Sequence, residues 1–87
     1  MILDQEKISI IREKVREYVL QSAYCSENQI QNSTLIFKEG FFDSMGFVML
    51  ISFLNDNFNI TVSDNELIEE NFESIDAITN FAGKRIN

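Results

Sequence analysis

The sequence predicts an all-α domain, a four-helix bundle with three main helices, one short helix and a long first loop. Proline is absent and glycine occurs only three times, so few residues would interrupt a helix. Apolar residues recur at spacings of three and four in several segments, which is the pattern of amphipathic helices. The 87 residues are enough for one domain, 1–87, and too few for two.

The first helix is expected at about 4–23. Asp4 stands where an N-cap residue is expected, just before the apolar periodicity begins. Charged residues fill the face opposite the apolar one. The predicted inner face consists of Ile8, Ile11, Val15, Tyr18 and Val19.

A long loop is expected next, with a polar stretch at 26–34 and an apolar cluster at 35–42. Loops of this length are uncommon in compact domains, so it indicates either a function or an error in the assignment. The apolar residues offer a solution, because a loop with its own apolar anchors can be pinned across the core. A short strand at 34–37 is the alternative, disfavoured because no partner strand is visible.

The second helix should begin at Asp43 or Ser44 and end near Phe58. At 100° per residue, one side collects a set of large apolar residues and the other a mixed set. The apolar side holds Phe47, Leu50, Ile51, Leu54 and Phe58; the opposite side holds Met45, Met49, Ser52 and Asp56, with Val48 and Asn55 beside Ser44.

The remaining chain predicts an extended connector at 60–62, a short third helix from 64 to about 71, and a last helix. In the short helix, Leu67 and Ile68 are expected to face inward and Glu66, with its acidic neighbours, outward. Ser74 is the expected N-cap of the last helix. The inner face of that helix should hold Ile75, Ile78, Phe81 and Ala82.

Charge and composition exclude several classes of function. The net charge of −7 disfavours nucleic acid as a ligand, because phosphate backbones require clustered Lys and Arg. Most of the excess negative charge lies in 44–87, which suits either docking to basic protein surfaces or simple solubility. With no His and a single cysteine, Cys25, neither a conventional zinc site nor an internal disulfide is expected.

The expected location is cytoplasmic. A lone cysteine fits a reducing compartment, and the first residues lack the basic and apolar regions of a secretory signal. The longest apolar run, 47–51, is too short to cross a bilayer, so no membrane insertion is expected. Cys25 is expected to be a small buried apolar residue.

The most informative stretch surrounds the predicted start of the second helix. Asp43 and Ser44 alone are ordinary helix-capping residues. Their context resembles the acyl carrier family, in which Asp-Ser-Leu or a near variant opens the second helix of a four-helix bundle. The lead-in is closest in motif to D-alanyl and other aminoacyl carriers. The resemblance is carried by Glu39-Gly40-Phe41-Phe42-Asp43-Ser44-Met45-Gly46-Phe47-Val48 and continues through Leu50, Leu54, Phe58, Ile60, Val62, Glu66, Phe72, Ser74 and Ile78.

The resemblance implies a non-catalytic carrier with a covalent 4'-phosphopantetheine arm on Ser44. A phosphopantetheinyl transferase would attach the arm from coenzyme A, and Asp43 would shape the helix start and aid recognition of a metal or the transferase. The thiol of the arm, not Cys25, would hold an acyl or aminoacyl group as a thioester. The implied partners are the transferase, a loading ligase and a downstream transferase or synthase of fatty acid or secondary metabolite biosynthesis, with the carrier a monomer.

Met45, Val48, Met49 and Asp56 are the candidate docking residues for these partners, since exposed methionines adapt to several surfaces. The alternative is that the apolar ones cover the core or a cargo chain. The second helix carries fewer acids than in many fatty-acid carriers, which indicates a specialised pathway. Ser63 also stands where aminoacyl carriers have proline.

Two further interpretations compete with the carrier. A calcium-binding loop at 56–67 fails on register, because Phe58, Thr61 and Leu67 occupy positions that require a ligand, a glycine and a bidentate glutamate. An unmodified helical interaction module remains the alternative function. An enzyme is disfavoured, since no His, paired-carboxylate cleft or phosphate-binding loop is visible.

Overall fold

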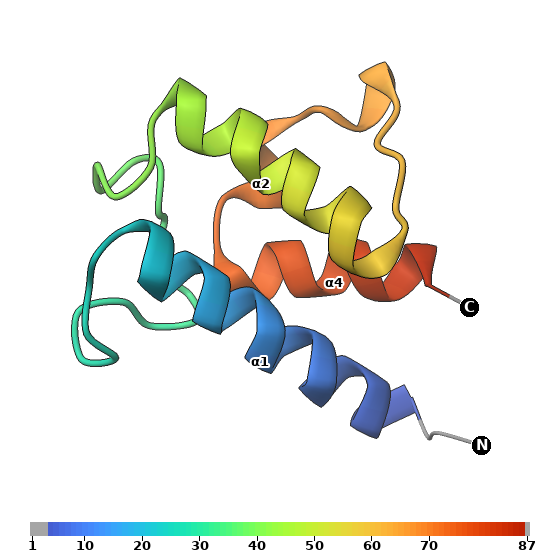
Figure 1. Cartoon of the computed structure of the whole chain (residues 1–87), viewed down its shortest axis with the longest axis horizontal. Helices are drawn as coiled ribbons and strands as arrows, with labels where there is room; N and C mark the ends of the chain where they lie inside the picture. Colours follow the sequence, from blue (N-terminus) through green and yellow to red (C-terminus); the bar gives the residue numbers. More distant parts are fainter. Residues whose placement is uncertain (1–3, 87) are drawn as a thin grey trace.

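The protein, seen in a computed structural model that describes residues 4–86, is all-α, and no strand occurs in that range. Figure 1 shows α1 and α4 side by side, with α2 above both in this view. This arrangement confirms the prediction of three long helices, one short helix and a long first loop. The elements are α1 (Asp4–Ser22), α2 (Ser44–Phe58), the 3-10 helix η1 (Asp64–Glu66), α3 (Glu69–Phe72) and α4 (Ile75–Arg85).

The core forms where the inner faces of the three long helices meet. Leu50 and Leu54 of α2 are fully buried, and Phe47, Ile51 and Phe58 are partly buried beside them. In α1 and α4 the predicted inner faces are likewise turned inward. Ile11, Val15, Val19, Ile75, Ile78, Phe81 and Ala82 are buried, and Ile8 and Tyr18 are partly buried.

Gly83 of α4 packs against Ile8 of α1. A Cβ atom at position 83 would lie 2.5 Å from Cδ1 of Ile8, so the end of that side chain would have to shift. Lys7 of α1 also donates a hydrogen bond from Nζ to the carbonyl oxygen of Ile86, at 2.7 Å. The start of α1 is thereby held against the end of α4.

The loop at 23–43 is pinned across the core, as expected from its apolar residues. Ile30 and Ile36 have no exposed surface, although the sequence pattern had singled out only the second of them. The backbone N–H of Ile36 donates to the Glu73 carbonyl at 2.9 Å, and that of Asp76 donates to the Asn32 carbonyl at 2.9 Å. The alternative of a strand at 34–37 is wrong, because residues 34–35 are irregular and a turn begins at residue 36.

The predicted bounds of the short helix, 64 to about 71, are wrong, because this range holds η1 and then the separate helix α3. The backbone of Ile68 is extended, with φ −118° and ψ 149°, and separates η1 from α3. Leu67 and Ile68, expected to face inward, are 41% and 45% exposed. Phe72 fills the core in their place and has no exposed surface.

A network centred on Glu66 holds η1, the element just before this break, to Ser63 and to α4. Its carboxylate accepts hydrogen bonds from the backbone N–H and the hydroxyl of Ser63, at 3.0 and 2.9 Å, in a capping box. The same carboxylate pairs with Arg85, whose guanidinium also donates to the Thr61 carbonyl at 2.9 Å. Glu66 is therefore partly buried, not exposed as predicted, and it ties the connector to α4.

The sequence analysis made one prediction for each end of α1, a capping role for Asp4 and burial of Cys25. The helix includes Asp4, whose side chain lies outside the described part, so its capping role stays a prediction. Cys25 follows the helix end and is partly buried against the core, with its Sγ donating to the Ala23 carbonyl at 3.3 Å. This agrees with a small apolar packing role more than with an exposed thiol.

Candidate functional site

The start of α2 is organised by Asp43. This residue is the N-cap, with extended backbone angles, and its Oδ1 accepts a hydrogen bond from the backbone N–H of Gly46 at 2.9 Å. Its carbonyl oxygen accepts from the N–H of Phe47, also at 2.9 Å. Ser44 is then the first residue of the helix and is exposed. The two residues singled out in the sequence thus occupy the predicted positions.

The chain reaches this helix start through a tight turn and one anchored aromatic side chain. Gly40 adopts φ +87°, a left-handed conformation that glycine reaches at no steric cost. Phe42 is 7% exposed, and its N–H donates to the Ile36 carbonyl at 3.0 Å. Gly46 packs on this ring, because a Cβ there would lie 3.0 Å from Cδ2 of Phe42. The glycines therefore allow Phe42 to fix the residues that precede Ser44.

The backbone at the start of α2 favours a negative group on Ser44, whereas the carboxylates of Asp43 and Glu69, which line the adjacent surface, oppose it. The backbone N–H groups of Ser44 and Met45 have no acceptor among the described residues, as is usual in a first helical turn. They carry the positive end of the helix dipole, which stabilises an anion by a few tenths to about 1 kcal/mol. No acidic side chain lies in the first turn of α2.

An apolar groove opens on one side of Ser44. We call it the Phe groove; it lies between the start of α2 and the 67–72 segment and has a volume of about 460 Å³. Its aromatic rings meet edge to face, with centroids 5.5 to 5.8 Å apart. It is lined by Phe37, Phe42, Asp43, Ser44, Phe47, Leu67, Ile68, Glu69 and Phe72.

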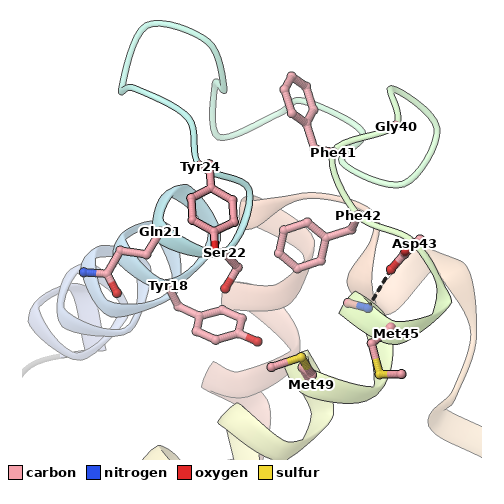
Figure 2. A pocket seen from close by; sticks show the side chains of 11 residues that line it. Tyr18, Gln21, Ser22, Tyr24, Gly40, Phe41, Phe42, Asp43, Met45 and Met49 are labelled. Carbon is pink, nitrogen blue, oxygen red and sulfur yellow. Dashed lines mark hydrogen bonds between the residues drawn. The ribbon is translucent and has the colours of Figure 1, made fainter.

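A second hollow opens between the end of α1 and the start of α2, with a volume of about 580 Å³. We call it the α1–α2 hollow, and Figure 2 shows its walls: residues of α1 on one side and Met45 and Met49 of α2 on the other. Sequence reasoning missed the part contributed by α1. The lining residues are Tyr18, Gln21, Ser22, Tyr24, Gly40, Phe41, Phe42, Asp43, Met45, Gly46 and Met49.

The predicted docking residues lie on the outer face of α2. Met45, Val48 and Met49 are 66%, 63% and 56% exposed, so they do not cover the core. Asp56 is exposed on the same face, but it lies twelve positions after Ser44 in the helix, about 18 Å along the axis. The structure therefore gathers the three apolar residues near Ser44 and leaves Asp56 at the far end of the helix.

The described residues contain no group of three or more His, Cys, Asp or Glu side chains placed to hold a metal ion. In the same part of the chain, no helix has the length and apolar character needed to cross a membrane. No protein-family model matches this chain, and the search of curated proteins found no significant match. The carrier class is therefore a proposal that depends on the motif and on the geometry around Ser44.

Proposed function

We propose that this protein is an acyl carrier protein, with the corresponding bundle fold. It carries an acyl or aminoacyl group as a thioester on a 4'-phosphopantetheine arm attached to Ser44, and delivers it between partner enzymes. The observation that carries the proposal is the position of Ser44, exposed on the first residue of α2 directly after a capping aspartate. The motif around it resembles acyl carriers, closest to the aminoacyl branch.

The residues around Ser44 fit a phosphodiester-linked arm. A phosphate on this side chain would lie beside the unpaired N–H groups of Ser44 and Met45 and the positive helix end. The carboxylate of Asp43 already accepts a hydrogen bond from Gly46 and so keeps the helix start in place. The Phe groove begins at Ser44, so an apolar cargo on the arm has an apolar surface within reach.

The chemistry performed on this chain is one substitution at phosphorus. The Ser44 Oγ forms an ester bond to the phosphate of coenzyme A that bears the pantetheine, the pyrophosphate bond breaks, and adenosine bisphosphate leaves. The hydroxyl proton passes to a base of the transferase or to water. When bound, the arm supplies the thiol that forms the thioester. The chain itself presents Ser44, and tethering raises the effective concentration of the cargo at each docked enzyme.

The proposal includes the setting of the carrier. It is non-catalytic, monomeric and cytoplasmic, and its partners are a phosphopantetheinyl transferase, a ligase that loads the cargo and a downstream transferase or synthase. These encounters must be brief, so modest interfaces are expected. Negative charge concentrated in 44–87 favours approach to partners with basic surfaces, while the few charges on α2 favour a specialised pathway.

Intact mass spectrometry tests the proposal. The wild-type protein, incubated with a broad-specificity phosphopantetheinyl transferase and coenzyme A, is expected to gain the mass of one phosphopantetheine. Ser44→Ala should gain nothing, whereas Ser52→Ala, which removes another exposed hydroxyl of α2, should be modified like the wild type. An unchanged wild-type mass, or modification of Ser44→Ala, contradicts the proposal.

The second candidate function is an unmodified helical interaction module. The exposed apolar side chains of Met45, Val48 and Met49 favour it, because such a patch is typical of binding surfaces. It predicts that Ser44 stays bare in the same incubation. The mass measurement therefore separates the two functions.

A further inference from the structure

Tyr24 is the most exposed large hydrophobic side chain of the described residues, at 96%, and it stands in an unusual backbone conformation. Its φ is +55°, in the left-handed region that bulky residues rarely adopt. The backbone N–H of Tyr24 donates to the Gln21 carbonyl at 3.3 Å, and that of Cys25 donates to the Leu20 carbonyl at 3.0 Å. This is the Schellman pattern of helix termination, in which glycine is the usual left-handed residue.

The end of α2 shows the ordinary solution to the same problem. Asn59, with φ +57°, is the left-handed residue there, and its N–H donates to the carbonyl oxygens of Asn55 and Leu54. Asparagine is one of the few residues other than glycine that tolerates this conformation. At the end of α1 the tyrosine side chain adds strain and buries almost no surface. Folding alone therefore gives no reason for a tyrosine at position 24.

Tyr24 belongs to the rim of the α1–α2 hollow. Phe41 stands on the loop side, and Met45 and Met49 form the wall on α2. Tyr18 is held in place by stacking on Phe53, with ring centroids 4.1 Å apart and planes 18° apart. Among the described residues, no Lys or Arg lines the hollow, and its one charged residue, Asp43, already accepts a hydrogen bond from the backbone of α2. The hollow thus presents aromatic and thioether side chains beside the polar Gln21 and Ser22, and offers no basic group to an anion.

We propose that the α1–α2 hollow is where the phosphopantetheinyl transferase docks, inserting an aromatic or branched aliphatic side chain between Tyr24 and Met49. The proposal rests on the carrier function proposed above. An enzyme that brings a phosphate to Ser44 must cover the start of α2, and Met45 and Gly46 of that helix turn line the hollow. Exposed tyrosine and methionine are residue types enriched at protein interfaces.

Charge favours this occupant over the others. A second copy of the chain would bring a net charge of −7 against −7, which disfavours a weak apolar dimer. An anionic membrane surface would be repelled for the same reason. A different protein that docks through a protruding apolar side chain faces neither of these two charge repulsions.

Steady-state kinetics of arm transfer, with the carrier as the varied substrate, tests the inference. Tyr24→Gly and Met49→Gln are each expected to raise KM about tenfold while kcat stays close to the wild-type value, because binding surface is lost and Ser44 is untouched. Tyr24→Gly should at the same time raise Tm by about 4 °C, because glycine relieves the left-handed strain. A purely structural tyrosine would not combine higher stability with weaker docking.

Two matched controls define the comparison. Asn59→Gly makes the same backbone change at the end of α2, and Ile10→Gln removes an exposed apolar side chain of α1 outside the hollow. Both should keep the wild-type KM. A KM unchanged within about twofold in Tyr24→Gly and Met49→Gln overturns the inference and leaves the carrier function standing.

Two other outcomes are decisive. A wild-type chain that gains no arm overturns the carrier function and, with it, the docking site. Sedimentation that shows a dimer for the wild type and a monomer for Tyr24→Gly assigns the hollow to a second copy, which also overturns the inference. A monomer in both cases agrees with it.

Discussion

Both faces of α2 carry large apolar residues, yet only one of the faces belongs to the core. Leu50 and Leu54 have no exposed surface, whereas Met45, Val48 and Met49 are each more than half exposed. Apolar residues on the inner face are explained by burial, which contributes about 25 cal/mol for each Å² removed from water. The outer face has no such explanation. The comparison teaches that the apolar content of a helix divides into a part that folds the chain and a part available for contacts with other molecules.

Truncating each face should separate the two roles most strongly. Leu54→Ala is expected to lower the free energy of unfolding by about 2–5 kcal/mol, because it leaves a cavity at a fully buried site. Met49→Ala should change it by less than about 0.5 kcal/mol, because the side chain is mostly in water. Urea denaturation measures both values. Similar losses in the two variants would show that the outer face also stabilises the fold.

The first turn of α2 fixes where both faces begin, and a substitution there should have a smaller effect on the free energy of unfolding. Asp43→Ala should lower the free energy of unfolding by about 1 kcal/mol, because the N–H of Gly46 loses its acceptor. Asp43→Asn keeps a side-chain oxygen and should keep most of that stability. Thermal unfolding followed by circular dichroism measures both. If Asp43→Ala matched the wild type, the cap would contribute nothing to the start of α2.

The smallest effect is expected away from α2, in the connector that Glu66 ties to α4. Hydrogen bonds from the backbone of Ser63, then from Arg85 and from the Ser63 hydroxyl, hold the pKa of Glu66 below its ordinary value. Because the pKa of Glu66 is lower in the folded state than in the unfolded state, its carboxylate adds stability at pH values above the unfolded-state pKa. That added stability is lost as the pH falls through the folded-state pKa. Glu66→Gln should therefore lose less stability than the wild type on acidification across that interval.

Urea midpoints measured across the acidic range test this prediction. Glu13→Gln, which changes an exposed carboxylate of α1, is the control and should follow the wild-type pH profile. Parallel profiles for the wild type and Glu66→Gln would show that the network does not couple stability to pH. Solvent screens the ion pair between Glu66 and Arg85, so the expected difference in stability between the wild type and Glu66→Gln is small.

The three long helices could be predicted closely because each carries a local signal. Asp43 and Ser74 accept backbone hydrogen bonds at the helix starts where their residue types predicted caps. The third helix could not be predicted in the same way. Glu66, at the end of η1, pairs with Arg85 nineteen residues further on, and no local pattern shows that contact.

The candidate site also has one part with a local sequence signal and one part that depends on distant contacts. Ser44 and Asp43 were predicted from adjacent residues and from the resemblance to acyl carriers. The α1–α2 hollow was missed, because it exists only once the 23–43 loop brings Phe41 and the end of α1 near α2. One signal was present in the sequence: no glycine stands at the end of α1, where the chain turns at Tyr24.

The most direct test of the central claim examines the protein as its own cells make it. Fragmentation mass spectrometry of the purified native protein should find a phosphopantetheine on the peptide that contains Ser44, at the hydroxyl exposed on the first residue of α2. Collisional activation should eject the arm, and the backbone fragment ions that remain should locate its attachment at Ser44. A population of molecules in which Ser44 is always unmodified would contradict the account.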